Sequence, residues 1–385
     1  MNESIIIGAD IVPTNVNQKY FCTGDISNIV DQRVQKLLFC AKYRIYNLET
    51  VLYDDEDKIV KCGPNLKTSV EAINALKKLY PNLLSMANNH AMDYGEKGIN
   101  STQDILKKNG IPYVGAGKNI IEAKKEHYFN INNVKVGVYA CVENEFSIAT
   151  TSKSGCNPLD LLEISDEIRK IKANCDFLIV LYHGGNERYR YPAPYLQKIS
   201  HKIADSGADL IVCQHSHCIG CEENYKNTKI IYGQGNFIFV SDKYECYKTS
   251  FLLKIDLSKK DNEVLAKYDY YPLCIEKSIV CLANEECAKN IMMDYFERSS
   301  KIKEEGYIQK KYDEYSLKML DDVYYPRILG RISNNIFYKI INRICYKKIS
   351  KLFYNTQDKL GVINVCECEA HRELMLNGLK KTIYK

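Results

Sequence analysis

Three short apolar runs in the middle of the chain are each followed by a histidine or asparagine. The runs are Phe177–Tyr182, Leu210–Cys213 and Lys229–Tyr232. Their composition is typical of strands buried on both faces. His183 follows the first run, His215 and His217 follow the second, and Asn236 follows the third. Ligands gather just past the carboxyl ends of strands in open α/β sheets, and imidazole is the commonest metal-binding side chain. The pattern therefore predicts a metal site containing the three histidines.

A second group of polar residues follows the strands expected in the N-terminal half. These strands are Ser4–Ile7, Arg44–Leu48 and Leu83–Ala87. Asp10 comes shortly after the first strand and Glu49 directly after the second. The third runs into Asn88-Asn89-His90-Ala91-Met92-Asp93-Tyr94-Gly95, which alone would suit an Asx turn and a helix start. Beside a separate histidine cluster, we interpret it as functional.

The elements that position these residues alternate between strand and helix. Apolar periodicity predicts helices over 68–80, 96–109, 159–173 and 193–206. Asn132-Asn133 between two β-rich runs predicts a hairpin, so we expect a mixed sheet or two sheets packed together. Gly115-Ala116-Gly117 is only a fragment of a dinucleotide-binding loop, and we expect no nucleotide site there.

Composition bounds the class of protein. The 385 residues carry a net charge of +5, and among the 16 cysteines Cys141, Cys213 and Cys281 stand within apolar runs. Cysteines in such runs behave as small hydrophobic residues, so we expect them to be reduced. No nucleic-acid partner is expected from this charge. The start MNESIIIGAD lacks a basic segment and no apolar run reaches membrane-spanning length. We expect a cytoplasmic protein without a signal peptide.

The order of these motifs resembles the CapA family. The motifs are Gly8-Ala9-Asp10, Asn47-Leu48-Glu49, Asn88-Asn89-His90 with Asp93 and Gly95, His183-x-Gly185-x-Glu187, His215-x-His217 and Gly235-Asn236-Phe237. This family comprises poly-gamma-glutamate and capsule biosynthesis proteins and is related to the calcineurin-like metallophosphatases. The resemblance covers about residues 4–257. It implies a four-layer α/β/β/α sandwich with a dinuclear metal centre at the strand ends.

The resemblance also implies roles for single residues. The implied metal ligands are Asp10, Glu49 as the bridging carboxylate, Asn89, His183, His215 and His217. His90 is the implied catalytic neighbour, and we group Asp93 and Glu187 with it as catalytic residues. We expect Arg188 and Asn236 to bind substrate, although Glu187 and Arg188 equally suit a surface loop pair.

The chain departs from the family pattern at several of these positions. Val12 occupies the position of the first histidine ligand, and Glu49 is longer than the usual aspartate. Ala9 replaces a glycine, and Cys213 and Gln214 precede His215 where a glycine and a histidine are common. One of the two metal positions is therefore short of one nitrogen ligand.

The chemistry expected from these side chains is metal-assisted hydrolysis. Imidazoles with carboxylates suit zinc, manganese or iron. Two such ions roughly 3.5–4 Å apart can generate hydroxide at neutral pH and hold a phosphorus centre during displacement. His90 would protonate the leaving oxygen. The expected function is a hydrolase of a phosphoester or amide in capsule or surface-polymer synthesis, with an anionic polymer or a phosphorylated or peptidic compound as substrate. A non-catalytic accessory protein of the same synthesis, and a metal-free acid/base enzyme acting on a peptide, are the alternatives.

The character of the chain changes towards its C-terminus. We expect a metallophosphatase-type domain over residues 1–283 and a helical, basic region over 284–385. Residues 327–354 contain seven basic residues and no acidic one, with isoleucines recurring every four residues from Ile332 to Ile344. Such a helix suits peripheral contact with an anionic membrane or polymer, or it packs its isoleucine stripe on the main domain.

Overall fold

The structure is a computed structural model that describes residues 2–261, 263–324, 335–345 and 356–383. By compactness the chain divides into two units, Met1–Ile308 and Gln309–Lys385. Among the described residues, no helix combines the length and apolar character needed to cross a membrane.

The first sheet contains the N-terminal strands and a long C-terminal hairpin. Its strands are β1 (Asn2–Ile11), β2 (Ala41–Leu48), β5 (Leu83–Ser85), β6 (Tyr113–Val114), β15 (Asn236–Ile238), β16 (Thr249–Lys260), β17 (Glu263–Glu276) and β18 (Ile279–Leu282). Their order is β18-β17-β16-β1-β2-β5-β6, and β15 pairs with the end of β1. The β1, β2, β5 and β6 strands are parallel, so their carboxyl ends meet at one edge.

The second sheet contains the three runs that precede the histidines and Asn236. Its strands are β8 (His127–Ile131), β9 (Val134–Val142), β11 (Phe177–His183), β12 (Leu210–Gln214), β13 (Glu222–Tyr225) and β14 (Thr228–Ile231). The order is β13-β14-β12-β11-β9-β8, with the four central strands parallel. The predicted hairpin joins β8 to β9, and Asn132 and Asn133 both have the positive φ that its turn requires.

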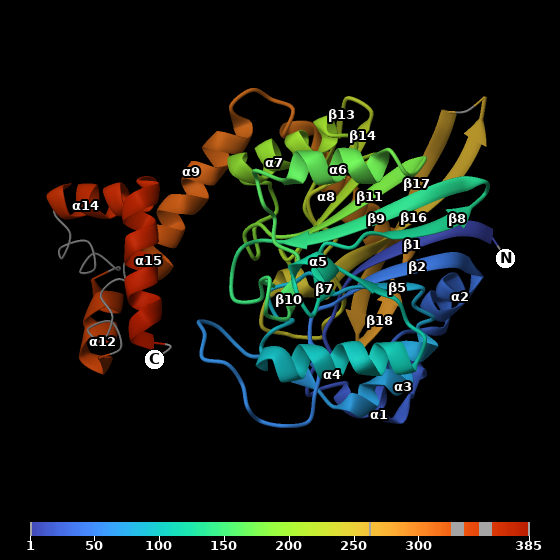
Figure 1. The fold of residues 1–385 in the computed structure, drawn as a ribbon, viewed down its shortest axis with the longest axis horizontal. Coiled ribbons are helices and arrows are strands. Elements are labelled where there is room, and N and C mark those ends of the chain that lie inside the picture. The colour runs from blue at the N-terminus through green and yellow to red at the C-terminus, as the bar shows by residue number, and fades with distance from the viewer. Residues whose placement is uncertain (1, 262, 325–334, 346–355, 384–385) are drawn as a thin grey trace. The chain divides into compact units, whose positions relative to one another are not determined.

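Helices cover the outer face of each sheet (Figure 1). They are α1 (Gln18–Thr23), α2 (Gln32–Cys40), α3 (Ile73–Lys78), α4 (Gly95–Lys108), α6 (Ile164–Lys172) and α7 (Pro194–Asp205). The α1, α3 and α4 helices lie beneath the first sheet, and α6 and α7 lie above the second. The shorter elements are β3 (Val51–Leu52), β4 (Lys67–Thr68), β7 (Ala116–Gly117), β10 (Gly155–Cys156) and α5 (Ile120–Ala123). The α/β/β/α order confirms the predicted four-layer sandwich.

The space between the sheets is filled by the strand residues that the sequence marks as apolar. Ile5 and Ile7 of the first sheet and Ile179 and Val212 of the second belong to one continuous buried core. All sixteen cysteines are free, as expected, and seven of them are buried. This core fixes the two sheets against each other, and therefore fixes the residues at their carboxyl ends.

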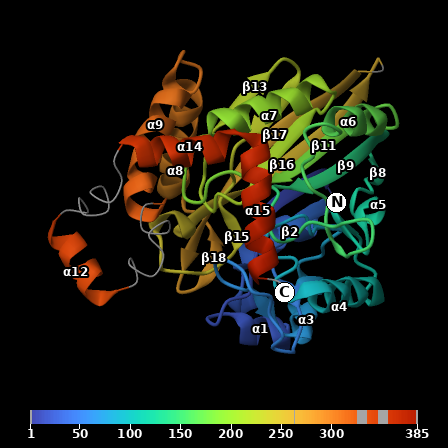
Figure 2. The same ribbon diagram turned by 60° about the vertical axis from the view of Figure 1, so that its left-hand side comes forward.

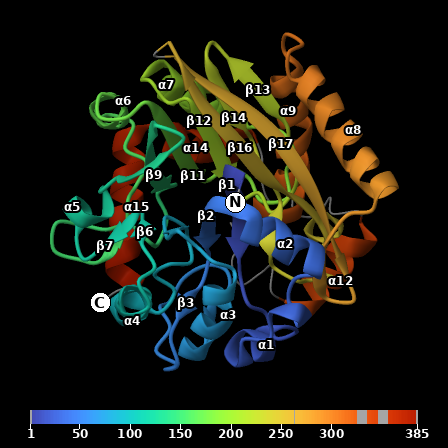
Figure 3. The ribbon, with the colours of Figure 1, turned by 90° about the vertical axis from the view of Figure 1, so that its right-hand side faces the viewer.

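Helix α8 (Glu285–Lys301) packs on the strands of the first unit (Figure 3). Asn284 caps its first turn by accepting a hydrogen bond from the backbone N–H of Cys287. Tyr295 is fully buried, with its ring 5.3 Å from that of Phe251 on β16. The two compact units thus divide after Ile308. The domain boundary after residue 283, which is placed by the change in composition, stays a proposal.

The second unit is helical where it is described. Helix α9 (Tyr307–Met319) leads into it and continues as a π-helical turn, Leu320–Tyr324. The other helices are α12 (Ile336–Ile344), α14 (Thr356–Glu367) and α15 (Glu369–Ile383). The α14 and α15 helices meet at a sharp bend (Figure 2). Parts of the predicted isoleucine stripe, including Ile332, Ile349 and Leu352, lie outside the described residues.

Candidate metal centre

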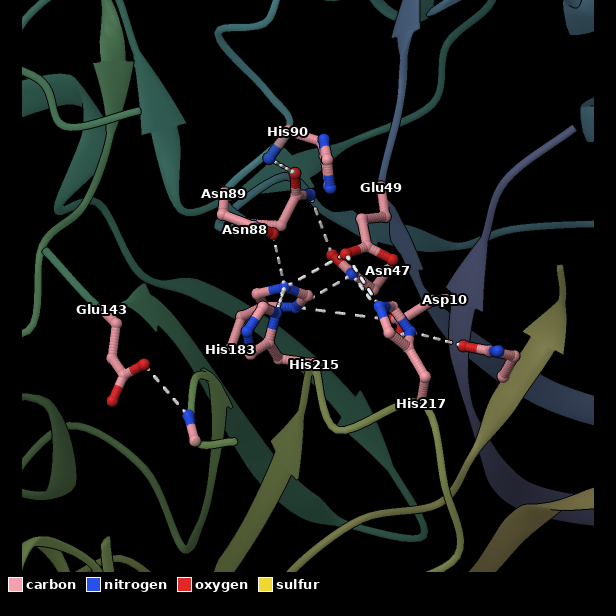
Figure 4. A network of polar contacts seen from close by, with 12 residues as sticks. Asp10, Asn47, Glu49, Asn88, Asn89, His90, Glu143, His183, His215 and His217 are labelled. Atoms are coloured by element: carbon pink, nitrogen blue, oxygen red, sulfur yellow. Dashed lines mark hydrogen bonds and ion pairs between the residues drawn. The ribbon is translucent and has the colours of Figure 1, made fainter. Parts of the chain in front are cut away.

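Six side chains from the carboxyl ends of both sheets converge at one buried point (Figure 4). Asp10 ends β1, Glu49 follows β2, Asn89 follows β5, His183 ends β11, and His215 and His217 follow β12. Each is at most 9% exposed. The structure therefore brings together all six residues that the sequence predicts as metal ligands, while their role as ligands stays a prediction.

Four of these side chains meet at the Nε2 atom of His183. Asn89 Oδ1 and His215 Nδ1 both lie 3.1 Å from it, and Glu49 Oε1 lies 3.3 Å from it. An imidazole nitrogen makes a single hydrogen bond, so three such neighbours exceed its capacity. Donor atoms bound to one metal at about 2.0–2.2 Å are separated by about 3 Å. The three distances from Nε2 of His183 therefore match the separation expected between neighbouring ligands of one metal.

Asp10 and His217 form a second, looser group next to the first. Asp10 Oδ2 lies 3.3 Å from Nδ1 of His217, and Glu49 Oε1 lies 3.9 Å from its Nε2. Nδ1 of His217 also contacts Oδ1 of Asn236 at 2.8 Å. Val12, at the position where the resemblance places a histidine, is buried and apolar. Glu49 belongs to both groups. The first group has four donor side chains, Asn89, His183, His215 and Glu49, and the second has three, Asp10, His217 and Glu49.

Glu49 fits a cation better than it fits any protein partner nearby. Its side chain is fully buried, and neither carboxylate oxygen accepts a hydrogen bond from a residue that the structure describes. A buried carboxylate without such bonds is costly unless a cation compensates its charge. One donor atom each from Glu49, His215 and His217 lie within 4.8 Å of one another. The residues present therefore fit a divalent metal.

The backbone of the His215-Ser216-His217 turn is itself unusual. His215 has φ +92° and His217 has φ +54°, conformations that residues with a Cβ rarely adopt. Strain of this kind costs roughly 1–3 kcal/mol per residue and is found mainly at functional sites. The turn aims both imidazoles back towards Glu49.

Burial and charge set the protonation of these side chains. Burial, with the neighbouring His183, His217 and His90, holds the pKa of His215 well below its usual range. Burial also disfavours charge on His217, but Glu49 and Asp10 outweigh it and raise the pKa of His217 to about 9. Burial opposes ionisation of Asp10, yet hydrogen bonding to His217 and the charge of His183 lower its pKa. His215 is thus neutral, the form that binds metals.

His90 and Asp93 form a hydrogen-bonded pair beside this group. Nδ1 of His90 lies 2.6 Å from Oδ2 of Asp93, which also accepts a 2.5 Å hydrogen bond from the backbone N–H of Leu66. Asn88 Oδ1 accepts the backbone N–H of His90 at 3.1 Å and so closes the turn after β5. The carboxylate favours the tautomer of His90 that is protonated on Nδ1, which leaves Nε2 available.

Glu187 and Arg188 occupy a more exposed position. Their side chains are 40% and 35% exposed and form an ion pair at 3.2 Å. The Arg188 guanidinium lies 4.4 Å from the centre of the Tyr244 ring, and Arg188 has φ +61°. The backbone N–H of Arg188 donates a 2.7 Å hydrogen bond to the carbonyl oxygen of Ser216, which lies between His215 and His217. The pair therefore lies close to the buried group but not in it.

Four further residues belong to this network and were not predicted. Asn47 donates a 2.7 Å hydrogen bond to Asp10, and Asn88 donates a 3.1 Å hydrogen bond to Asn47. Lys61 forms an ion pair with Asp93. Glu143 accepts the backbone N–H of Gly185 at 3.1 Å, and burial raises its pKa. The two asparagines stand inside recognised motifs, and Glu143 directly follows β9. Nothing local in the sequence marks Lys61.

Solved structures similar to this chain are distant. A phosphatase from Mycoplasma pneumoniae has a TM-score of 0.43 and 13% identity, covering 75% of this chain and 98% of its own. The 5'-nucleotidase precursor from Thermus thermophilus has a TM-score of 0.40 and 15% identity, covering 76% and 58%. At these TM-scores neither structure carries an argument about this chain.

Two relatives are closer in sequence. The capsule biosynthesis protein CapA of Bacillus anthracis is 32% identical over 260 residues, covering 65% of this chain and 62% of that protein. The PGA biosynthesis protein CapA of Bacillus subtilis (strain 168) is 31% identical over 212 residues, covering 54% and 56%. The chain thus spans little more than half the length of these curated relatives.

The family match includes every residue of the candidate centre. The bacterial capsule synthesis protein family PGA_cap matches residues 5–241, which is more than half of the chain and includes both sheets' carboxyl ends. The resemblance to capsule biosynthesis proteins is thereby confirmed. The chain belongs to the bacterial capsule synthesis protein family PGA_cap.

Proposed function

We propose that this protein is a metal-dependent hydrolase that acts on a phosphoester or amide bond during the synthesis of a capsule or other surface polymer. The observation that carries the proposal is the buried Glu49, which faces the imidazoles of His183 and His217 and has no hydrogen-bond donor among the described residues. Family membership supports the biological setting, and the donor set supports the chemistry.

The donor side chains would form two metal positions. Asn89, His183, His215 and Glu49 would hold the first ion, and Asp10, His217 and Glu49 would hold the second. Zinc, manganese and iron all suit this mixture of nitrogen and oxygen ligands. When bound, such an ion supplies Lewis acidity towards a phosphoryl or carbonyl oxygen. The four-donor position should bind more tightly than the three-donor position.

His90 would hold and deliver the proton that the leaving group needs. Its Nδ1 faces Asp93, so Asp93 would orient the ring and leave Nε2 to serve the leaving group. General acid catalysis of this kind contributes typically about 10²–10⁴-fold to the rate. Arg188 would bind an anionic group of the substrate from the exposed rim, with Glu187 beside it, and Asn236 would act there or through His217.

Turnover measurements test this proposal. The purified full-length chain is treated with a chelator, and zinc, manganese or iron is then returned separately. Hydrolysis of an aryl phosphodiester and of a gamma-glutamyl anilide is followed in each preparation. The proposal expects one of the two substrates to be hydrolysed only after a metal is returned. Equal hydrolysis with and without metal would instead support metal-free acid/base chemistry.

A non-catalytic accessory role is the second candidate function. It is favoured by the buried Val12, which leaves the Asp10 and His217 group with one nitrogen fewer than the related metallophosphatases. A protein of this kind would bind metal through the four-donor group and hydrolyse neither substrate. The same measurements, combined with metal content, therefore separate the two candidates.

The basic segment 327–354 suggests a peripheral contact with an anionic membrane. In the described helix α12, one apolar set is exposed: Ile336, Phe337, Ile340, Ile341 and Ile344. Arg343 is exposed on the same helix. An exposed apolar face flanked by basic residues is typical of helices that lie in a lipid headgroup region. We include this contact in the proposal, because it would place the enzyme where surface polymers are assembled.

A further inference from the structure

The loop between β3 and β4 places a buried lysine, Lys61, beside the His90–Asp93 pair. Lys61 has a side chain only 2% exposed, and Asp93 is fully buried. The ammonium group forms an ion pair with Oδ1 of Asp93 and lies 3.3 Å from Nδ1 of His90. Lysine is almost never buried unless it is paired, so this position needs an explanation beyond a solvated loop.

Asp93 is held by the same loop at three other points. Leu66 donates its backbone N–H to Oδ2, and the backbone oxygen of Asp93 accepts hydrogen bonds from Asn65 at 2.9 Å and from Ile59 at 3.0 Å. The ring of Phe146, from the segment after β9, lies 5.8 Å from the ammonium of Lys61. Residues 59–66 therefore form a strap across Asp93, and Lys61 is its charged contact.

The geometry assigns Lys61 as a positioning residue for His90. With Lys61 on Oδ1 and His90 on Oδ2, the plane of the Asp93 carboxylate is fixed. That plane holds the His90 ring with Nδ1 towards Asp93 and Nε2 towards the reacting bond. An Nδ1 atom that donates its proton to Asp93 cannot accept a hydrogen bond from the ammonium of Lys61, so Lys61 acts on His90 through Asp93 and does not itself bind substrate. This inference rests on the role proposed for His90.

A cycle of variants at positions 61 and 93 tests the inference. It comprises the wild type, Lys61→Gln, Asp93→Asn and the double variant. The double variant leaves no unpaired charge at positions 61 and 93, so it keeps the test valid if a single variant misfolds. Lys58→Gln is the control, because Lys58 is an exposed lysine of the same loop. Circular dichroism establishes folding, and nitrogen-15 NMR of the imidazoles, assigned with His90→Ala, reports the Nδ1 proton of His90.

The NMR readout does not depend on turnover. We expect a protected Nδ1 proton of His90 in the wild type and in Lys58→Gln. Its exchange with water should be faster in Lys61→Gln, because loss of the ion pair leaves the Asp93 carboxylate less firmly held. The double variant should match Asp93→Asn. A folded Lys61→Gln protein with the wild-type His90 signal would overturn the inference, as would a double variant that differs from Asp93→Asn.

Turnover adds an independent check where hydrolysis is found. Lys61→Gln should lower kcat by about 10- to 100-fold with KM nearly unchanged, and should have no further effect on an Asp93→Asn background. A raised KM that persists on that background would show direct substrate binding and contradict the assignment. If the wild type hydrolyses neither substrate, the proposed hydrolase activity fails, and the NMR result still decides the role of Lys61.

Discussion

At the scale of single residues, the centre consists of buried polar atoms whose hydrogen-bonding capacity is not matched by their neighbours. Nε2 of His183 has three donor or acceptor atoms within 3.3 Å, and Glu49 has two buried oxygens without a hydrogen bond. In an ordinary core these groups would destabilise the fold. Around a divalent cation the same atoms become ligands, so the apparent defects have a common explanation.

His90 should matter for turnover more than for metal binding. It pairs with Asp93 and stands outside both donor groups. We expect His90→Ala to lose activity by about 10²–10⁴-fold while it keeps the metal content of the wild type. Kinetics and elemental analysis on the same preparation check this. An active His90→Ala protein, or one that has lost its metal, would contradict the assigned role.

At the scale of elements, the strand ends were predictable and the loops were not. Alternating βα patterns and Asn132-Asn133 are local signals, so the strands leading to Asp10, Glu49 and His183 follow from the sequence. Helix α6 begins at Ile164, later than the expected residue 159, because Leu159 pairs with Val142 and the turn at Asp160 precedes the helix. Lys61 lies 32 residues before Asp93 in an acidic loop, and only the folded chain joins them.

The first glycine of the loop Gly115-Ala116-Gly117 packs closely against neighbouring alanines. Gly115 has φ +82°, and a Cβ there would lie 2.6 Å from Cβ of Ala87 and 2.9 Å from Cβ of Ala140. We expect Gly115→Ala to destabilise the protein by about 2–5 kcal/mol in urea unfolding, because backbone strain of about 1–2 kcal/mol and overpacking of about 1–3 kcal/mol add.

Gly110 offers the matched control for this substitution. It has φ +67°, but a Cβ there would meet no atom within 4 Å. Gly110→Ala should cost only the backbone strain of about 1–2 kcal/mol. Equal losses at the two positions would show that close packing at Gly115 contributes nothing.

The basic segment makes a separate prediction at the same scale. Seven basic residues between 327 and 354 should bind vesicles containing anionic lipid, each contributing roughly 1 kcal/mol near the surface. Binding should weaken with salt, because the Debye length is only about 8 Å at physiological ionic strength. Co-sedimentation at low and high salt measures this. No binding at low salt, together with aggregation of a protein lacking residues 327–385, would show that the isoleucines pack on protein.

At the scale of the whole molecule, the centre exists only when both sheets are in place. Asp10, Glu49 and Asn89 come from the first sheet, and His183, His215 and His217 come from the second. The buried core between the sheets sets the separation of the two groups. A metal bound by both groups would join the two halves of the sandwich and stabilise the folded state by mass action.

The central claim is that these donors bind metal, and metal content per chain tests it most directly. Elemental analysis is performed on the purified wild type, on His215→Ala and His217→Ala, and on His201→Ala as a control. His201 is a histidine outside the centre that pairs with Glu223 at 2.6 Å. The account predicts at least one zinc, manganese or iron ion per wild-type and His201→Ala chain, with His215→Ala well below that value. Wild-type metal content in both His215→Ala and His217→Ala would contradict it.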